Sequence, residues 1–291
     1  MRQLGWRAFV EKARGPSNLT AGVSCLPQKA RRLLAHLRRQ GASVVTSTAP
    51  WGPTRCDDSM RRGPHKSAQD ERAFVCEEIL DFCHQGYWAV MPYSAVRQWK
   101  NLRISPLGVV PQRDRRPRLI VDYSFSGVNA DTVPLAPKDS MQFGRALQRV
   151  LAKIVHADPR FGPVHLAKID IADGFYRVWL QWADIPKLGV ALPTAPGKLA
   201  LVAFPLALPM GWVESPPYFT SLTETACDLA NIALCTNASA SAHSTVHRLE
   251  EVASTPHRTV PLRTKVRARP LELPAMGSGE SPAHGSSGRV C

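Results

Sequence analysis

Two aspartates, Asp170 and Asp173, lie in the middle of residues 164–181, a stretch that otherwise has the composition of two extended apolar pieces. Leu166 and Ile169 give the first piece the pattern of a strand, so we expect Asp170 at its end, with its carboxylate facing a cleft. A carboxylate in such a place suits a hard cation such as Mg²⁺ or Mn²⁺. Nucleotidyl transfer usually needs at least two convergent carboxylates, and one aspartate alone makes a weak metal site. The alternative interpretation is that Asp170 is a capping or turn residue.

Four arginines gather in and beside a polar turn between two predicted strands: Arg113, Arg115, Arg116 and Arg118. The strands, Leu107–Val110 and Leu119–Tyr123, predict a β-hairpin within residues 102–125. Guanidinium groups suit phosphate because they donate paired hydrogen bonds to its oxygens. The alternative is a hairpin tip that carries solvated charge and binds nothing.

A third motif, Leu208–Phe219, is a turn punctuated by prolines. Gly211 would let a ligand or another backbone segment come close, since it has no side chain. Pro216 and Pro217 suit the first turn of a following helix, which we expect to run to Leu234. The alternative is a stiff loop without a binding role.

Taken in order, the three motifs resemble those of reverse transcriptases from long-terminal-repeat-type and related retroelements, over roughly residues 68–235. Arg118–Ser124, with Asn129 downstream, is similar to the fingers hairpin of that family. Lys168–Phe175 is similar to its first palm motif, and Leu208–Pro216 to the next one.

The resemblance implies a role for each matched residue. Asp170 would be the catalytic residue that binds the metal ions, and Phe175 would be the steric gate that excludes ribose. Arg113 and Arg118 would neutralise the incoming triphosphate, while Met210 and Gly211 would contact the nucleotide and the template. The implied activity is RNA-directed DNA polymerisation, with Mg²⁺ or Mn²⁺, deoxynucleotide triphosphates, an RNA template and a DNA primer.

The next motif of that family, an aromatic-x-Asp-Asp hairpin with the remaining metal-binding carboxylates, has no match after Asp170; the one Asp-Asp pair, Asp57-Asp58, precedes it. We therefore expect a truncated and inactive domain. One alternative is a non-catalytic remnant whose basic ends bind nucleic acid. Another is a truncated product that does not fold stably, because a palm sheet without its central hairpin exposes strand edges.

The charge is uneven along the chain. The net charge is +14 over 291 residues, and residues 1–67 alone carry 13 Lys and Arg against 3 Asp and Glu. We interpret this segment as a basic, mostly disordered arm that suits a polyanion or is merely solvated, with a flexible linker at residues 42–67. Residues 236–291 are rich in small and polar residues and are expected to be a disordered tail.

Between these ends, residues 68–235 show the patterns of a mixed α+β domain. We expect an incomplete right-hand polymerase fold, with fingers and a partial palm between disordered N- and C-terminal segments. Besides the hairpin, the predicted elements are helices over residues 27–40, from an N-cap at Ser67 to Gly86 and over 139–156, and strands at Tyr87–Met91 and Leu199–Phe204.

Other sequence features exclude some classes of protein. No run of 18 apolar residues is present, so we expect no transmembrane helix and no membrane partner. The seven cysteines show no metal-binding spacing and no disulfide framework, which favours a reducing, intracellular compartment. The basic ends fit a nuclear and a cytoplasmic location equally, and nothing in the sequence indicates an oligomeric state.

Overall fold

The computed structural model describes residues 5–14, 28–136, 146–164, 171–195, 197–223 and 226. The chain divides into two compact units. One consists of Met1–Phe143 and Asp173–Leu262, and the other of Gly144–Ala172 and Arg263–Cys291. The predicted tail at 236–291 lies outside the described residues, as does Asp170.

The first unit contains both helices and strands. Its helices are α1 (Gly5–Arg14), α2 (Gln28–Gln40), α3 (Pro53–Arg62), α4 (Lys66–Asp70), α5 (Arg72–His84), α6 (Tyr93–Val96) and α7 (Val128–Asp131), with short 3₁₀ turns η3 (Gly174–Arg177) and η4 (Ile185–Leu188). Its strands are β1 (Trp88–Pro92), β2 (Ile104–Gln112), β3 (Arg115–Val121), β4 (Gly189–Ala191) and β5 (Leu201–Pro205). Residues 215–223 are also helical.

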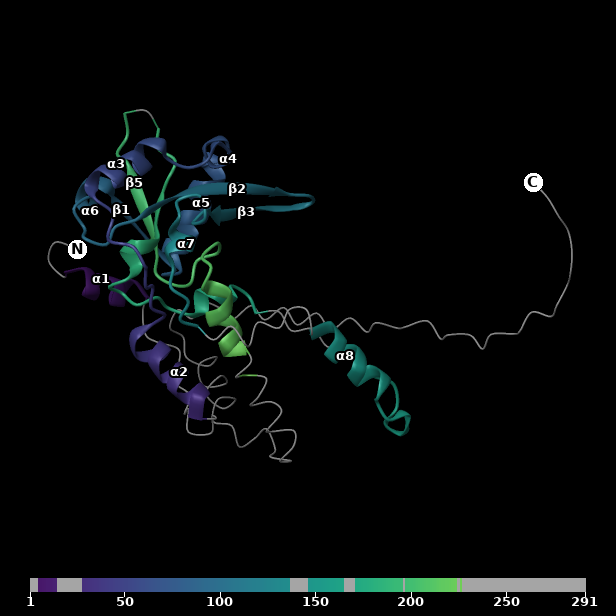
Figure 1. The fold of residues 1–291 in the computed structure, drawn as a ribbon. Helices are drawn as coiled ribbons and strands as arrows, with labels where there is room; N and C mark the ends of the chain where they lie inside the picture. The colour runs from purple at the N-terminus through teal and green to yellow at the C-terminus, as the bar shows by residue number, and fades with distance from the viewer. Residues whose placement is uncertain are drawn as a thin grey trace, which may run out of the picture. The chain divides into compact units, whose positions relative to one another are not determined.

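The five strands form one mixed sheet in the order β1-β5-β4-β2-β3. The pairs β1–β5, β5–β4 and β2–β3 are antiparallel, whereas β2 and β4 run parallel. Figure 1 shows β2 and β3 extending as a long hairpin beyond the other strands. The fold is therefore α+β, as the sequence patterns predict.

The predicted hairpin is confirmed, and both of its strands are longer than expected. Gln112 pairs with Arg115, so the chain reverses over Arg113 and Asp114, and Asp114 takes a left-handed φ of 57°. Aspartate tolerates that conformation better than most residues with side chains. The pairing then moves from Gln112–Arg115 to Val110–Arg118, which leaves an extra residue in β3.

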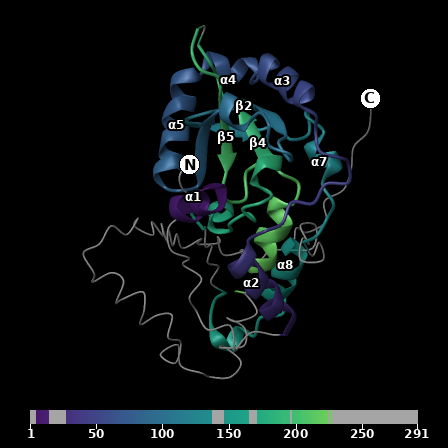
Figure 2. The ribbon, with the colours of Figure 1, turned by 90° about the vertical axis from the view of Figure 1, so that its left-hand side faces the viewer.

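Helices surround the sheet. The helices α3 and α4 contact β2, and α5 and α6 contact β1; Figure 2 shows α3, α4 and α5 in an arc beside the strands. The helix predicted from Ser67 is broken into α4 and α5 at Glu71. Ser67 is not an N-cap: its hydroxyl accepts a hydrogen bond from the backbone N–H of Val109 (3.1 Å), which ties α4 to β2.

The linker expected at residues 42–67 is an incorrect prediction. Ala42 and Val44 are fully buried there, and Trp51 and Cys56 are almost so. Isolated bridges join Ala42 to Leu180 and Thr46 to Thr132. The buried residues are single and irregularly spaced among Ser, Pro and Gly, so neither a helical nor a strand period reveals them.

One further prediction is partly corrected. The second extended piece of residues 164–181 begins with the 3₁₀ turn η3 and becomes extended only at Trp179 and Leu180. In the second unit, the helix predicted at 139–156 is confirmed where it is described, as α8 (Ala146–Val155), while residues 139–145 lie outside the described residues. The 3₁₀ turn η2 (Pro159–Phe161) follows α8. In the part of the chain that the structure describes, no helix is both long and apolar enough to cross a membrane.

A buried arginine connects the segment before α3 to the sheet. Arg103 is 1% exposed, and its guanidinium forms an ion pair with Asp131 at 2.5 Å. It also donates to the carbonyl and hydroxyl oxygens of Thr48 (3.2 and 3.1 Å). Hydrogen bonds from Thr48 and Arg103 lower the pKa of Asp131, so this carboxylate is charged at neutral pH.

We expect Arg103→Met to lower the free energy of unfolding by about 3–5 kcal/mol, because it leaves a largely buried carboxylate without its cation. Urea denaturation measures the change. The matched control is Arg97→Met, which removes a solvent-exposed ion pair with Asp57 and should have a much smaller effect, since water screens that pair. Equal losses in the two variants would contradict the role assigned to Arg103.

Candidate functional site

The arginine hairpin presents charge to solvent. Arg113 and Arg118 are exposed, and among the residues that the structure describes neither has an acidic partner. Arg116 differs, because its guanidinium contacts Glu78 at 2.7 Å and Glu77 at 3.3 Å on α5. One arginine of the turn therefore holds the hairpin against α5, while Arg113 and Arg118 remain available to an anion.

The base of the hairpin lies directly against the turn at residues 208–215. Gly211 has φ of 102°, and a Cβ atom at this position would stand 2.2 Å from the carbonyl oxygen of Val121 and 3.7 Å from the Tyr123 ring. Any side chain here would collide with the backbone of β3. Gly211 thus allows close approach, as the sequence predicts, and its neighbour is the protein backbone.

Asn129 joins the same two segments through its side-chain amide. Its Nδ2 donates to the Gly211 carbonyl (3.0 Å), and its Oδ1 accepts from the Val213 N–H (3.0 Å). Its backbone N–H donates to the Tyr123 carbonyl (3.1 Å). One residue therefore fixes the turn at 208–215 relative to the end of β3.

Buried polar groups hold the rest of this turn. The indole N–H of Trp212 donates to Thr132 Oγ1 (3.1 Å), and the Ser215 hydroxyl donates to the Pro209 carbonyl (2.7 Å). Glu214 is 1% exposed, and its Oε2 accepts from the N–H groups of Leu135 and Ala136 at 2.9 and 3.0 Å. These bonds leave the turn little freedom.

The Leu208–Phe219 motif contacts the Lys168–Phe175 motif through aromatic rings. The rings of Phe175 and Phe219 meet edge to face with centroids 5.3 Å apart. Gly174 lies under the same ring, since a Cβ there would be 2.6 Å from Phe219 Cζ. The part of the Lys168–Phe175 motif that follows Asp170 thus packs on the helix that follows the turn at 208–215.

The charge of Asp173 acts on three groups around η3, the phenols of Tyr87 and Tyr176 and the carboxylate of Glu78. Tyr176 stacks on Tyr87 with centroids 4.9 Å apart, and the charge of Asp173 acts on both phenols. Burial raises the pKa of Glu78, while Arg116 opposes the change and Asp173 adds to it. Asp173 itself has a left-handed φ of 54° and is exposed.

The described residues show how far the predicted site residues come together. Gly211 and the base of the hairpin are in contact, and Phe175 is bound to the same turn through Phe219. Met210 is 42% exposed beside Gly211. Asp170 lies outside the described residues, so its position relative to the others remains a prediction.

The described carboxylates do not converge on a metal site. Across the described ranges, no three His, Cys, Asp or Glu residues gather closely enough to hold a metal ion. Asp173, which belongs to the Lys168–Phe175 motif, and Glu78 do not form such a group, and Glu78 is already paired with Arg116. The described residues therefore do not by themselves fit Mg²⁺ or Mn²⁺.

The sequence motifs include Asn129 and Glu214, but the sequence assigns no role to either residue. Both residues form hydrogen bonds with partners 78 to 84 positions away along the chain, which no local spacing reveals. Comparison with known proteins gives no match: no family model fits the sequence, and no curated protein is significantly similar to it.

We expect Gly211→Ala to destabilise the protein by more than about 2 kcal/mol, since the new Cβ would collide with the Val121 carbonyl and the backbone would be strained. Thermal and urea unfolding measure the loss. Gly127→Ala is the matched control, because Gly127 also has a positive φ (79°) but nothing stands within 4 Å of its Cβ position. Gly127→Ala should lower the free energy of unfolding by only about 1 kcal/mol. A similar loss of unfolding free energy in both variants would show that the close approach at Gly211 does not contribute to stability.

Proposed function

We propose that this chain is a reverse-transcriptase-like domain of retroelement type, with fingers and a partial palm, that binds triphosphate and nucleic acid but does not extend a primer by itself. The observation that carries the proposal is the convergence of the three motifs. The arginine hairpin, the Gly174–Phe175 segment and the turn at 208–215 meet through Gly211, Asn129 and Phe219.

The convergence supports the proposal because the motifs are far apart in sequence. Asn129, which follows the hairpin on α7, is joined to the turn by bonds that span more than 80 residues. A stiff loop without a binding role would not need its glycine in contact with a β-hairpin, nor an asparagine that binds both sides. The arrangement is what a nucleotide site needs, namely a fixed floor beside a charged arm.

The charged arm supplies the binding chemistry in this proposal. Arg113 and Arg118 would donate charge-assisted hydrogen bonds to phosphate oxygens, and both are free of acidic partners in the described part of the chain. Phe175 would border the sugar and Met210 would border the base or template, as the resemblance implies. A right-hand polymerase architecture is part of the same proposal.

Catalysis is the part of the family's function that we do not propose for this chain alone. The described carboxylates form no metal cage, and no aromatic-x-Asp-Asp motif follows Asp170 within these 291 residues. This chain has only one of the two carboxylate motifs that the family uses to hold its metal ions. Nucleotidyl transfer to a primer would therefore lack much of the transition-state stabilisation that two metal ions provide. We therefore derive no reaction step through a metal.

A second candidate function is a non-catalytic basic module that binds nucleic acid through its phosphates alone. Arg113 and Arg118 favour it, because both are exposed, have no acidic partner among the described residues and would attract any polyanion. The two candidates differ in specificity. A nucleotide site should prefer a deoxynucleotide triphosphate to inorganic triphosphate, whereas a purely electrostatic surface should not.

The first prediction from this proposal concerns the hairpin. We expect Arg113→Ala with Arg118→Ala to weaken binding of a deoxynucleotide triphosphate by at least about tenfold, because two charge-assisted contacts are lost. Calorimetric titration at constant salt measures it. The control is Arg61→Ala with Arg72→Ala, which removes the same charge from exposed positions on α3 and α5. Equal affinity in the two double variants would refute the role of the hairpin.

The second prediction concerns activity. We expect no primer extension on an RNA template with Mg²⁺ or Mn²⁺, either by the chain or by its Asp170→Asn variant. A gel assay with labelled primer measures extension. If the chain extends the primer and the variant does not, the chain completes a metal site and the proposal of an inactive domain is wrong.

A further inference from the structure

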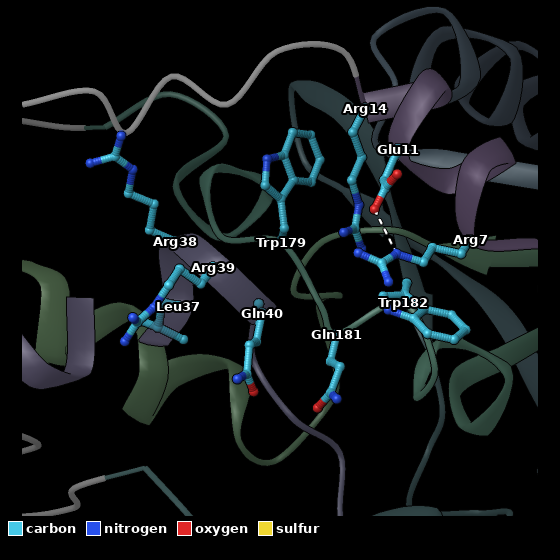
Figure 3. A pocket seen from close by; sticks show the side chains of 11 residues that line it. Arg7, Glu11, Arg14, Leu37, Arg38, Arg39, Gln40, Trp179, Gln181 and Trp182 are labelled. Carbon is cyan, nitrogen blue, oxygen red and sulfur yellow. Dashed lines mark hydrogen bonds and ion pairs between the residues drawn. The ribbon is translucent and has the colours of Figure 1, made fainter. Parts of the chain in front are cut away.

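A cleft of about 460 Å³ opens between α1, the C-terminal end of α2 and residues 179–182. Figure 3 shows Arg7 and Arg14 on one side of it, near Trp182, and Arg38 and Arg39 on α2 beyond Trp179. The volume is within the range of small-molecule sites. None of the three motifs contributes a residue to its lining, so the cleft is separate from the proposed nucleotide site.

The lining carries surplus positive charge. Arg7, Glu11 and Arg14 follow one face of α1 at the spacing i, i+4, i+7. Arg7 Nε is 2.9 Å from Glu11 Oε1, and Glu11 is the single acid among the described residues of the lining. The lining therefore holds four arginines and one carboxylate, which Arg7 already occupies, while Arg39 donates its Nε–H to the Ala35 carbonyl (3.2 Å).

Arg14 has no carboxylate partner among the described residues. Its Nη2 donates to the carbonyl oxygens of Leu180 and Leu206, and its Nε is buried with no hydrogen-bond partner in that part of the chain. Burial lowers the pKa of Arg14 to about 10, and the charge of Glu11 offsets part of that change. The guanidinium is still charged at neutral pH, and a nearby anion would stabilise it.

Two tryptophans position the arginines of α1. The Arg14 guanidinium lies 5.3 Å from the centre of the Trp179 ring, and that of Arg7 lies 5.7 Å from the Trp182 ring. Trp6, also on α1, donates its indole N–H to the Trp182 carbonyl (2.9 Å). These contacts fix α1 on residues 179–182, so the two cations are arranged before any ligand arrives.

We propose that this cleft binds a phosphate group, with Arg7 and Arg14 of α1 and Arg38 and Arg39 of α2 around it. The phosphate could belong to a small polyphosphate or to the backbone of a single nucleic-acid strand; the chemistry is shared, and the experiment separates the two sources. The proposal does not depend on the proposed polymerase-like function, because no residue is common to both sites.

The test is a calorimetric titration of pyrophosphate into the full chain at low, constant salt. All variants also carry Arg113→Ala and Arg118→Ala, so the hairpin cannot contribute. We expect Arg7→Gln with Arg38→Gln to weaken pyrophosphate binding by at least about tenfold, since one cation is lost from each wall of the cleft. Arg14 is left in place because its bonds to the carbonyls support the fold.

Two further variants make the test specific. Arg61→Gln with Arg72→Gln changes the net charge equally away from the cleft and should leave the affinity unchanged. Glu11→Gln removes the acid from the lining and should strengthen binding by several fold, whereas Glu71→Gln, an exposed position outside the cleft, should not. Circular dichroism confirms that each variant is folded.

A short oligothymidylate separates the sources of phosphate. If it competes with pyrophosphate and loses affinity in the Arg7→Gln, Arg38→Gln variant, the cleft binds a nucleic-acid strand; if it does not compete, the cleft binds a small polyphosphate. Absence of pyrophosphate binding would overturn the proposal, as would equal affinity in the two arginine double variants. Should the Arg7→Gln, Arg38→Gln variant not fold, an unchanged affinity in Glu11→Gln would overturn it alone.

Discussion

The contact of Gly211 with the Val121 carbonyl is the constraint on which the candidate site depends. Two backbone segments more than 80 residues apart approach so closely that no side chain fits between them. Asn129 then forms hydrogen bonds with the Gly211 carbonyl and the Val213 N–H, two backbone groups of the turn that would otherwise need water as their partner. Because the turn leads into the helix at 215–223, the same contact also places Phe219 over Gly174 and Phe175.

The partners of five arginines divide them into two classes. Arg103 and Arg116 are matched by carboxylates, and their charges connect segments of the fold. Arg14 is matched only by carbonyl oxygens, and Arg113 and Arg118 have no acidic partner within the described ranges. Desolvating a cation is costly unless a partner compensates, so an external anion would stabilise the buried Arg14. Arg113 and Arg118 are solvated and keep their donors free for an anion.

The sequence predicted the local elements better than their assembly. The hairpin and the strands at Trp88–Pro92 and Leu201–Pro205 follow from apolar runs between turn residues, and these are local signals. β4 was missed because it has only three residues, and it is a strand only through its neighbours β2 and β5. The residues around Trp51 and Cys56 were assigned to a linker for a related reason, since single buried side chains among prolines show no period. Gly211 was predicted as a point of close approach, but its partner, Val121, could be known only from the fold.

The same limitation affects how the basic charge of residues 1–67 is understood. Composition alone suggests a solvated arm, whose binding would depend on salt and little on shape. In the structure, Arg7, Arg14, Arg38 and Arg39 lie on two helices, α1 is packed through Trp6 on Trp99 and Phe204, and Gly41 at the end of α2 contacts the Leu180 backbone. The guanidinium groups of Arg7 and Arg14 therefore have defined positions relative to Trp182 and Trp179. Charge fixed in this way can distinguish ligands by the spacing of their anionic oxygens, whereas the same number of arginines on a flexible arm would respond mainly to net charge.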